Sequence, residues 1–322
     1  MYSNNQTTHP YSPGKVLEEI NKFSVESTHG VVSTAFDDRH IRTAKVTSQY
    51  KLLNIKSFFN DIIGVLTKVM DIETYSFRVD KGIQEISLMS KIIIINGDEY
   101  RKAFYILNST DRTRALRFNI GLYRVDGQRL VIPVPECVTV VRFVHKGKEF
   151  ETKVDNIHDF VYTFSKVVAR QVEILENLGN NKVSLRKLLG KMLFEESTDV
   201  IAGASKNRAT AFCKQLRVHP TDKVNLVDYG ISLSDMALLA KPTDFMLHSN
   251  SDFLINAYQA LQCYHSIYQG RDVGIISRES SRFMDYLEHC QMVPEDRGIT
   301  LAKPTVRQKT RRVGSHQTAM PV

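Results

Sequence analysis

Hydrophobic positions after Asn54 recur every three or four residues, which is the period of an amphipathic helix. Asn54 is of a residue type that caps helix N-termini. The apolar positions that share one face are Ile55, Phe58, Phe59, Ile62, Ile63, Leu66, Val69 and Met70. This stripe predicts a core helix rather than a cofactor site. A shorter helix is predicted over 14–23, and strands are predicted near 31–36 and 42–53.

From residue 72 to residue 146 the pattern changes to the two-residue period of β-strands. Asn96-Gly97 is the strongest hairpin signal in the chain, and Asp126-Gly127 marks a second tight turn. The predicted strands lie at 72–79, 83–95, 100–107, 114–124, 128–134 and 138–145. Consecutive strands joined by short turns predict an antiparallel meander of about five or six strands.

The helical period returns at Asp155, a good N-cap residue, and continues to Leu178, after which Gly179 ends the helix. Further helices are predicted over 184–196, 205–217, 231–240, 252–269 and 278–290. A meander flanked by long helices predicts an α+β protein.

The same pattern divides the chain into four parts. We expect an α+β core domain over 14–180 and a mostly helical C-terminal region over 181–296. The ends are polar and poor in large apolar residues, so 1–13 is predicted to be a disordered arm and 297–322 a disordered basic tail.

Composition narrows the class of protein. The 322 residues are 42% hydrophobic and 24% charged, as in folded soluble proteins. Four cysteines are too few for a disulfide scaffold. The chain contains no run of eighteen apolar residues, and its polar N-terminus does not resemble a secretory signal. We therefore expect a cytoplasmic protein without a membrane partner.

Charge is concentrated in two blocks, although the net charge of the chain is only +8. Residues 100–150 hold ten Lys and Arg against four acids, and the last 26 residues hold six bases and no acid. Each block therefore carries +6, and the remainder of the chain is mildly acidic. Two basic blocks on an acidic body predict attraction to a polyanion. Exposed strands and tails that carry Lys and Arg only for solubility are the alternative.

Single-stranded nucleic acid binds to positive grooves whose aromatic rings stack on the bases. Tyr105 and Tyr123 are the candidate platforms, and rings that complete the core are the alternative for both. The predicted nucleic-acid-binding residues are Arg112, Arg114, Arg117, Tyr123, Arg124, Arg129, Arg142, Lys146 and Lys148 in the meander, and Lys303, Arg307, Lys309, Arg311 and Arg312 in the tail.

Several of these strand and turn segments resemble a known family, the phage- and plasmid-like proteins classed as domain of unknown function family 932. The matching segments are 46–50 before the first long helix, 107–115 in a turn, Gly121–Arg124 in a strand, Gly127 in a turn and His145–Gly147 before the second long helix. Arg112 departs from the family pattern because it stands in place of the turn glycine. The resemblance covers roughly residues 45–180.

The family resemblance implies a fold and a setting rather than an activity. Proteins of this family occur in prophages and mobile elements, among recombination and anti-restriction genes, which favours a role with DNA.

Other chemistry is weakly supported by the sequence. No phosphate-binding glycine loop is present. Cys263, His265, His289 and Cys290 match no standard zinc spacing. Two Ser-x-x-Lys matches, Ser48–Lys51 and Ser184–Lys187, lack the motifs that accompany a catalytic serine.

A magnesium nuclease is the enzymatic alternative. Asp126 with Glu151 and Lys153 could hold Mg²⁺ and activate water, but turn chemistry already explains Asp126.

We therefore expect a phage or mobile-element DNA-binding protein that acts without catalysis, holding or annealing single-stranded DNA in recombination or replication. A homo-oligomer is plausible, and no cofactor, metal or small-molecule substrate is expected. A virion-structural or host-interaction protein is the first alternative, and the Mg²⁺ nuclease is the second.

Overall fold

The computed structural model describes residues 8–28, 31–36, 39–46, 55–80, 83–109, 114–145, 157–193, 208–209, 211–212, 215–216, 254–290 and 293–294. Its centre is an antiparallel sheet in the order β1-β5-β6-β7-β8-β10, with β9 also paired to β8. These strands are β1 (His9–Pro10), β5 (Thr74–Asp80), β6 (Ile83–Ile95), β7 (Asp98–Ser109), β8 (Leu116–Arg124), β9 (Arg129–Leu130) and β10 (Val140–Phe143). The predicted α+β class and the antiparallel meander are confirmed.

The turns of the meander lie where the sequence predicts them. Asn96 and Gly97 both have positive φ, 50° and 84°, as a two-residue hairpin turn requires, and Ile95 pairs with Asp98 across it. In the second turn Gly127 has a φ of 95° and donates its N–H to the Arg124 carbonyl at 2.9 Å. A residue with a Cβ disfavours such angles, which explains the Asn-Gly and Asp-Gly pairs.

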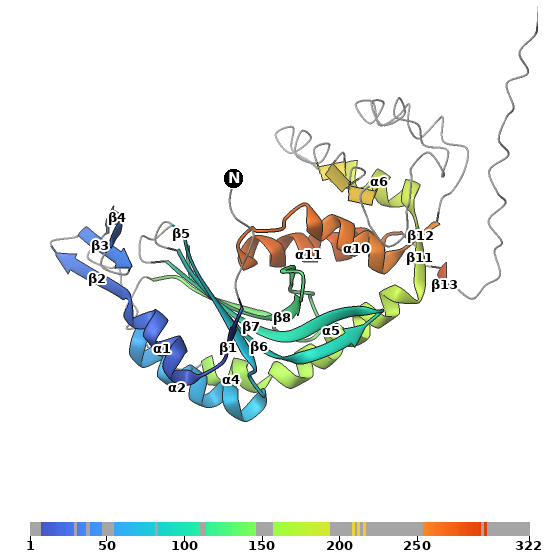
Figure 1. Ribbon diagram of the computed structural model, residues 1–322. Helices are drawn as coiled ribbons and strands as arrows, with labels where there is room; N and C mark the ends of the chain where they lie inside the picture. The colour runs from blue at the N-terminus through green and yellow to red at the C-terminus, as the bar shows by residue number, and fades with distance from the viewer. Residues whose placement is uncertain are drawn as a thin grey trace, which may run out of the picture.

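One face of the sheet packs against the helices that precede and follow the meander (Figure 1). These helices are α1 (Pro13–Asn21), α2 (Ile55–Val69), α4 (Ile157–Tyr162) and α5 (Phe164–Gly179). Phe118 of β8 contacts Phe58 of α2, and Phe104 of β7 contacts Phe160 and Phe164. The hydrophobic core therefore joins the amphipathic stripes that the periodicity predicts.

The other face of the sheet lies toward α10 (Ala257–Ser266) and α11 (Val273–Glu288), drawn in orange in Figure 1. Next to them β11 (Asn181–Ser184) pairs with β12 (Leu254–Asn256) and β13 (Val293–Pro294), and α6 (Leu185–Leu193) follows β11. The C-terminal helices thus cover the sheet of the core domain.

A further small sheet forms near the N-terminus, in the order β2-β3-β4. Its strands are β2 (Phe23–Thr28), β3 (Val31–Phe36) and β4 (Arg39–Lys45). The sequence pattern does not predict β2, and β4 begins earlier than the strand predicted at 42–53. Within the described residues, the helices are all too short or too polar to cross a membrane.

Two predicted elements differ from the structure for identifiable reasons. The predicted strand at 128–134 pairs only over β9, because Pro133 lacks the N–H that a ladder needs. Instead, Gln171 of α5 donates to the Ile132 carbonyl at 2.7 Å. The predicted helix 155–178 is divided at Thr163, whose hydroxyl donates to the Phe160 carbonyl at 2.7 Å. Asp155, its predicted cap, lies outside the described residues.

Replacing Gly121 with alanine is expected to lower the free energy of unfolding by about 1–3 kcal/mol. A Cβ at Gly121 would lie 2.1 Å from the Leu130 carbonyl oxygen and 3.0 Å from Cε2 of Tyr105, so β9 would have to move. Urea denaturation measures the change. Gly64→Ala is the control, because no atom lies within 4 Å of its added Cβ and alanine favours helix. A Gly121→Ala variant as stable as the wild type would contradict the close approach of β8 and β9.

Candidate nucleic-acid interface

The sheet face turned toward α11 carries charged side chains in a single cross-strand row. The strand registers place Arg78 opposite Glu85, Glu85 opposite Leu107, Leu107 opposite Arg117, and Arg117 opposite Arg142. Directly opposed residues project from the same face of a sheet. The row therefore runs across β5, β6, β7, β8 and β10 on the face that α11 partly covers.

Glu85 is the negative centre of this row and is buried. Its carboxylate forms an ion pair with Arg129 and accepts the backbone N–H of Val273 at 3.1 Å, while Arg78 lies 3.9 Å away. Glu85 and Arg129 each have only 3% of their side chain exposed. The hydrogen bond from Val273 to Glu85 thus holds the first turn of α11 against the sheet.

The start of α11 is set by two local features of the sequence. Gly270 has a φ of 78°, which lets the chain turn sharply after α10. Asp272 caps α11 by accepting the Ile275 N–H at 3.0 Å. Arg271 and Asp272 are thereby held at the edge of the sheet, next to Arg114, whose guanidinium lies 3.4 Å from the Asp272 carboxylate.

An arginine cluster, which we define as Arg114, Arg117, Arg142 and Arg278, forms where β8, β10 and α11 meet. Arg117 and Arg142 are direct cross-strand neighbours, and neither forms an ion pair within the described residues. Like charges placed directly opposite each other on a sheet are destabilising. The fold therefore brings positive charge together here without an equal number of carboxylates.

The electrostatics of Arg117 reflect this crowding. Partial burial lowers the pKa of Arg117, and the positive charges of Arg142, Arg114 and Arg278 lower it further, against the attraction of Asp272. Its Nε–H is buried and has no acceptor in the described part of the chain. An anion bound beside Arg142 would relieve the repulsion between the two guanidinium groups.

Two predicted binding residues and the second candidate stacking ring lie inside the fold, which corrects the site expected from the sequence. Tyr123 is 2% exposed and packs with Tyr105 in a small cluster beneath Val273. The Tyr105 hydroxyl donates to the Leu122 carbonyl at 2.5 Å. Arg129 is paired with Glu85. Neither tyrosine presents a ring to a base, because alternation put both on the face that α11 covers.

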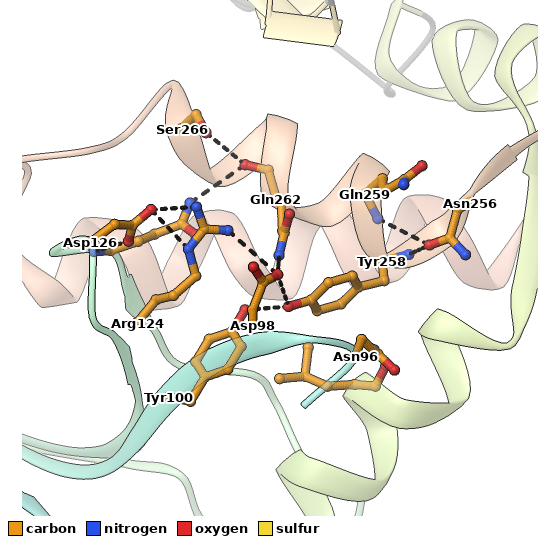
Figure 2. A network of polar contacts seen from close by, with 12 residues as sticks. Asn96, Asp98, Tyr100, Arg124, Asp126, Asn256, Tyr258, Gln259, Gln262 and Ser266 are labelled. Carbon is orange, nitrogen blue, oxygen red and sulfur yellow. Dashed lines mark hydrogen bonds and ion pairs between the residues drawn. The ribbon is translucent and has the colours of Figure 1, made fainter. Parts of the chain in front are cut away.

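Arg124 also has an internal role, shown in Figure 2. It forms ion pairs with Asp126 in the following turn and, at 3.9 Å, with Asp98 at the tip of the β6–β7 hairpin. Asp98 further accepts the Tyr258 hydroxyl at 2.6 Å and the Gln262 side chain, both from α10. This network clamps the hairpin tip to α10 and leaves Arg124 little capacity for a phosphate.

The remaining predicted basic residues fall outside the described residues. In the meander these are Arg112, Lys146 and Lys148, and in the tail Lys303, Arg307, Lys309, Arg311 and Arg312. Of the residues predicted from the sequence, Arg114, Arg117 and Arg142 are therefore the ones that the structure brings together.

Three arginines that the sequence pattern does not single out lie beside the predicted ones: Arg78, Arg271 and Arg278. Arg271 and Arg278 belong to the α10–α11 region, and no local pattern indicates that this region packs on the meander. The one available signal is Asp272, whose position before an apolar stripe is typical of an N-cap.

Neither metal hypothesis gains a site from the described residues. No group of three or more His, Cys, Asp or Glu side chains converges there as metal ligands would. His265 and Cys263 are buried in α10, and Asp126 is paired with Arg124. Glu151 and Lys153 of the nuclease alternative lie outside the described residues.

Searches against protein-family models, curated proteins and solved structures find no match to the chain. The resemblance to domain of unknown function family 932 stays a prediction from strand and turn motifs. The arginine cluster and its surroundings are therefore the features that bear on function.

Proposed function

We propose that this protein binds nucleic acid, with single-stranded DNA as the favoured form, through the arginine cluster and without a catalytic step. The observation that carries the proposal is the direct pairing of Arg117 with Arg142 at the edge of the sheet, with no carboxylate paired to either among the described residues. Arg114 and Arg278 lie beside them, paired with Asp272 at 3.4 Å and with Glu279 at 3.3 Å. A chain of phosphates supplies the regularly spaced negative charge that such a cluster lacks.

The chemistry of the cluster also limits the mode of binding. Guanidinium groups contact phosphates in a way that does not depend on base sequence. With Tyr105 and Tyr123 buried, stacking on these rings adds nothing to affinity. Binding is therefore expected to be insensitive to sequence and to weaken steeply as the salt concentration rises. The family resemblance favours DNA, and a duplex of equal length is the comparison that tests the expected preference for single strands.

The double variant Arg117→Ala/Arg142→Ala is expected to weaken oligonucleotide binding and to reduce the salt slope of log K by about 1–2, one phosphate contact for each arginine removed. Fluorescence anisotropy with a labelled single strand in rising salt measures both quantities. Arg142→Ala alone, at an exposed position, guards against misfolding of the double variant.

Arg170→Ala is the matched control, because Arg170 is an exposed arginine on α5 paired with Glu173. It should leave affinity and salt slope unchanged. Absence of binding by the wild type, or equal losses in Arg142→Ala and Arg170→Ala, would rule out the proposal.

A protein partner is the second candidate, and the edge of the sheet favours it. Within the described strands, β10 pairs only with β8, and the flanking Val138 and Val144 are 57% and 58% exposed. An extended acidic segment of a host or virion protein could add to this edge. Capture of a partner after nuclease treatment, lost in a Val138→Glu/Val144→Glu variant that repels an acidic segment, would support this function instead.

A further inference from the structure

A cavity of about 440 Å³ lies beside the arginine cluster, beneath the turn that joins α10 to α11. Arg78, Arg114 and Arg271 contribute to its wall from three separate elements, β5, the segment before β8, and the turn. Its volume is within the range of small-ligand sites. It is large enough for one nucleotide and too small for a duplex.

The charge of this cavity favours an anion. The carboxylates on its wall are Glu85 and Asp272. Arg129 neutralises Glu85 from inside the fold, and Asp272 already caps α11. Arg271 is exposed and forms no ion pair within the part of the chain described. Arg114 is paired with Asp272, and Arg78 donates to the Gly270 carbonyl at 3.0 Å. The excess of positive charge on the wall therefore comes from Arg271.

The cavity also offers an unused hydrogen-bond donor and apolar lining residues. The Nε–H of Arg114 is buried and has no acceptor among the described residues. A buried donor without an acceptor costs free energy that a ligand oxygen would recover. Ile83, Ile267 and Ile275 line the same cavity. Guanidinium groups bind phosphate through charge-assisted hydrogen bonds. The aliphatic side chains offer a surface against which the sugar or base of a nucleotide could pack.

We infer that this cavity binds the terminal phosphate of a nucleic-acid strand, an inference that rests on the proposed function. A terminal phosphomonoester carries about −1.5 to −2 charge near neutral pH, whereas each internal diester carries about −1. The excess of arginine in a one-nucleotide cavity therefore favours a strand end over the interior of a strand. Arg114 belongs both to this cavity and to the arginine cluster, so the strand would continue from the cavity onto the cluster.

The test compares three oligonucleotides of one sequence, carrying a 5′-phosphate, a 3′-phosphate or hydroxyl groups at both ends. Anisotropy competition is expected to show about tenfold tighter binding of one phosphorylated form by the wild type. Arg271→Ala should remove this preference, whereas Arg142→Ala should weaken all three strands alike. Equal affinity of the wild type for the three strands, or a preference that survives in Arg271→Ala, would overturn the inference.

A second measurement separates this inference from the proposed function. Thymidine monophosphate and thymidine are titrated against the protein by calorimetry. If thymidine monophosphate binds, thymidine does not, and Arg271→Ala abolishes the binding, the cavity is a phosphate site. If no oligonucleotide binds in addition, the ligand is a free nucleotide and the strand-end role is rejected. If oligonucleotides bind in a salt-dependent way but show no end preference, the proposed function holds and the cavity does not bind the terminal phosphate.

Discussion

Replacing Glu85 with alanine is expected to lower the free energy of unfolding by about 3–5 kcal/mol. Glu85 and Arg129 are both almost fully buried, and the alanine variant would leave the Arg129 guanidinium inside the fold without its counter-charge. The Nε and Nη2 of Arg129 already lack acceptors in the described structure. The Val273 N–H at the start of α11 would lose its acceptor as well. Urea denaturation followed by circular dichroism measures the loss.

Two further variants test the cause of this loss. Glu173→Ala breaks the exposed pair with Arg170 and should cost less than about 1 kcal/mol. Glu85→Leu/Arg129→Met removes both charges and should recover much of the stability that Glu85→Ala loses. If Glu85→Ala costs no more than Glu173→Ala, the pair does not hold α11 against the sheet as we describe.

Acidification from pH 6.5 to 4.5 is expected to lower the free energy of unfolding by about 2 kcal/mol through His265 alone. Burial lowers the pKa of His265 to about 3, against the attraction of Glu279, which favours the protonated ring. The unfolded chain takes up a proton at this histidine below pH ~6.5, whereas the folded protein does not until near pH 3. The stabilisation is thus complete above pH ~6.5 and is lost as the pH falls through this window.

The expected pH dependence of stability is specific to His265 because of the groups that surround its ring. The ring nitrogen Nε2 lies 3.1 Å from the Ser280 hydroxyl, which donates to the Ile276 carbonyl, so Nε2 carries the hydrogen of a neutral ring. Burial would raise the pKa of Glu279, but hydrogen bonds from Arg282 and Tyr264 outweigh this and lower that pKa. The lowered pKa means that Glu279 takes up its proton at a lower pH than an unperturbed glutamate does.

Urea denaturation at several pH values compares the wild type with His265→Gln. The glutamine variant should lose about 2 kcal/mol less stability than the wild type between pH 6.5 and 4.5. His289→Gln, at the exposed end of α11, is the control and should follow the wild type. Parallel pH curves for the wild type and His265→Gln would contradict the neutral, buried state of His265.

Much of the fold follows from patterns that are local in the sequence. Asn96-Gly97 and Asp126-Gly127 form the turns that their residue types demand, since each places a residue at positive φ. Helix α2 follows the three- and four-residue spacing of its apolar stripe, and Phe118 lies in the core as alternation along β8 predicts. The break between α4 and α5 depends on Thr163, and the shortness of β9 depends on Pro133. The hydrogen bonds of single residues such as these are not visible in the hydrophobic period of the sequence.

The candidate site was predicted less well, because a count of charges does not reveal their partners. Arg129 and Arg124 are as basic in the sequence as Arg117 and Arg142, yet Glu85, Asp126 and Asp98 neutralise the first two. Tyr123 shares the strand parity of Arg117, but α11 covers that part of the face.

The sequence by itself determined the α+β class, the order of the meander and the residues of each amphipathic face, because periods and turn residues act over a few positions. Only the tertiary structure decided which arginines stay without a carboxylate. That choice depends on α11, which brings Asp272, Arg271 and Arg278 to the edge of β8. Contacts between segments so distant in the chain arise from packing, which no local pattern encodes.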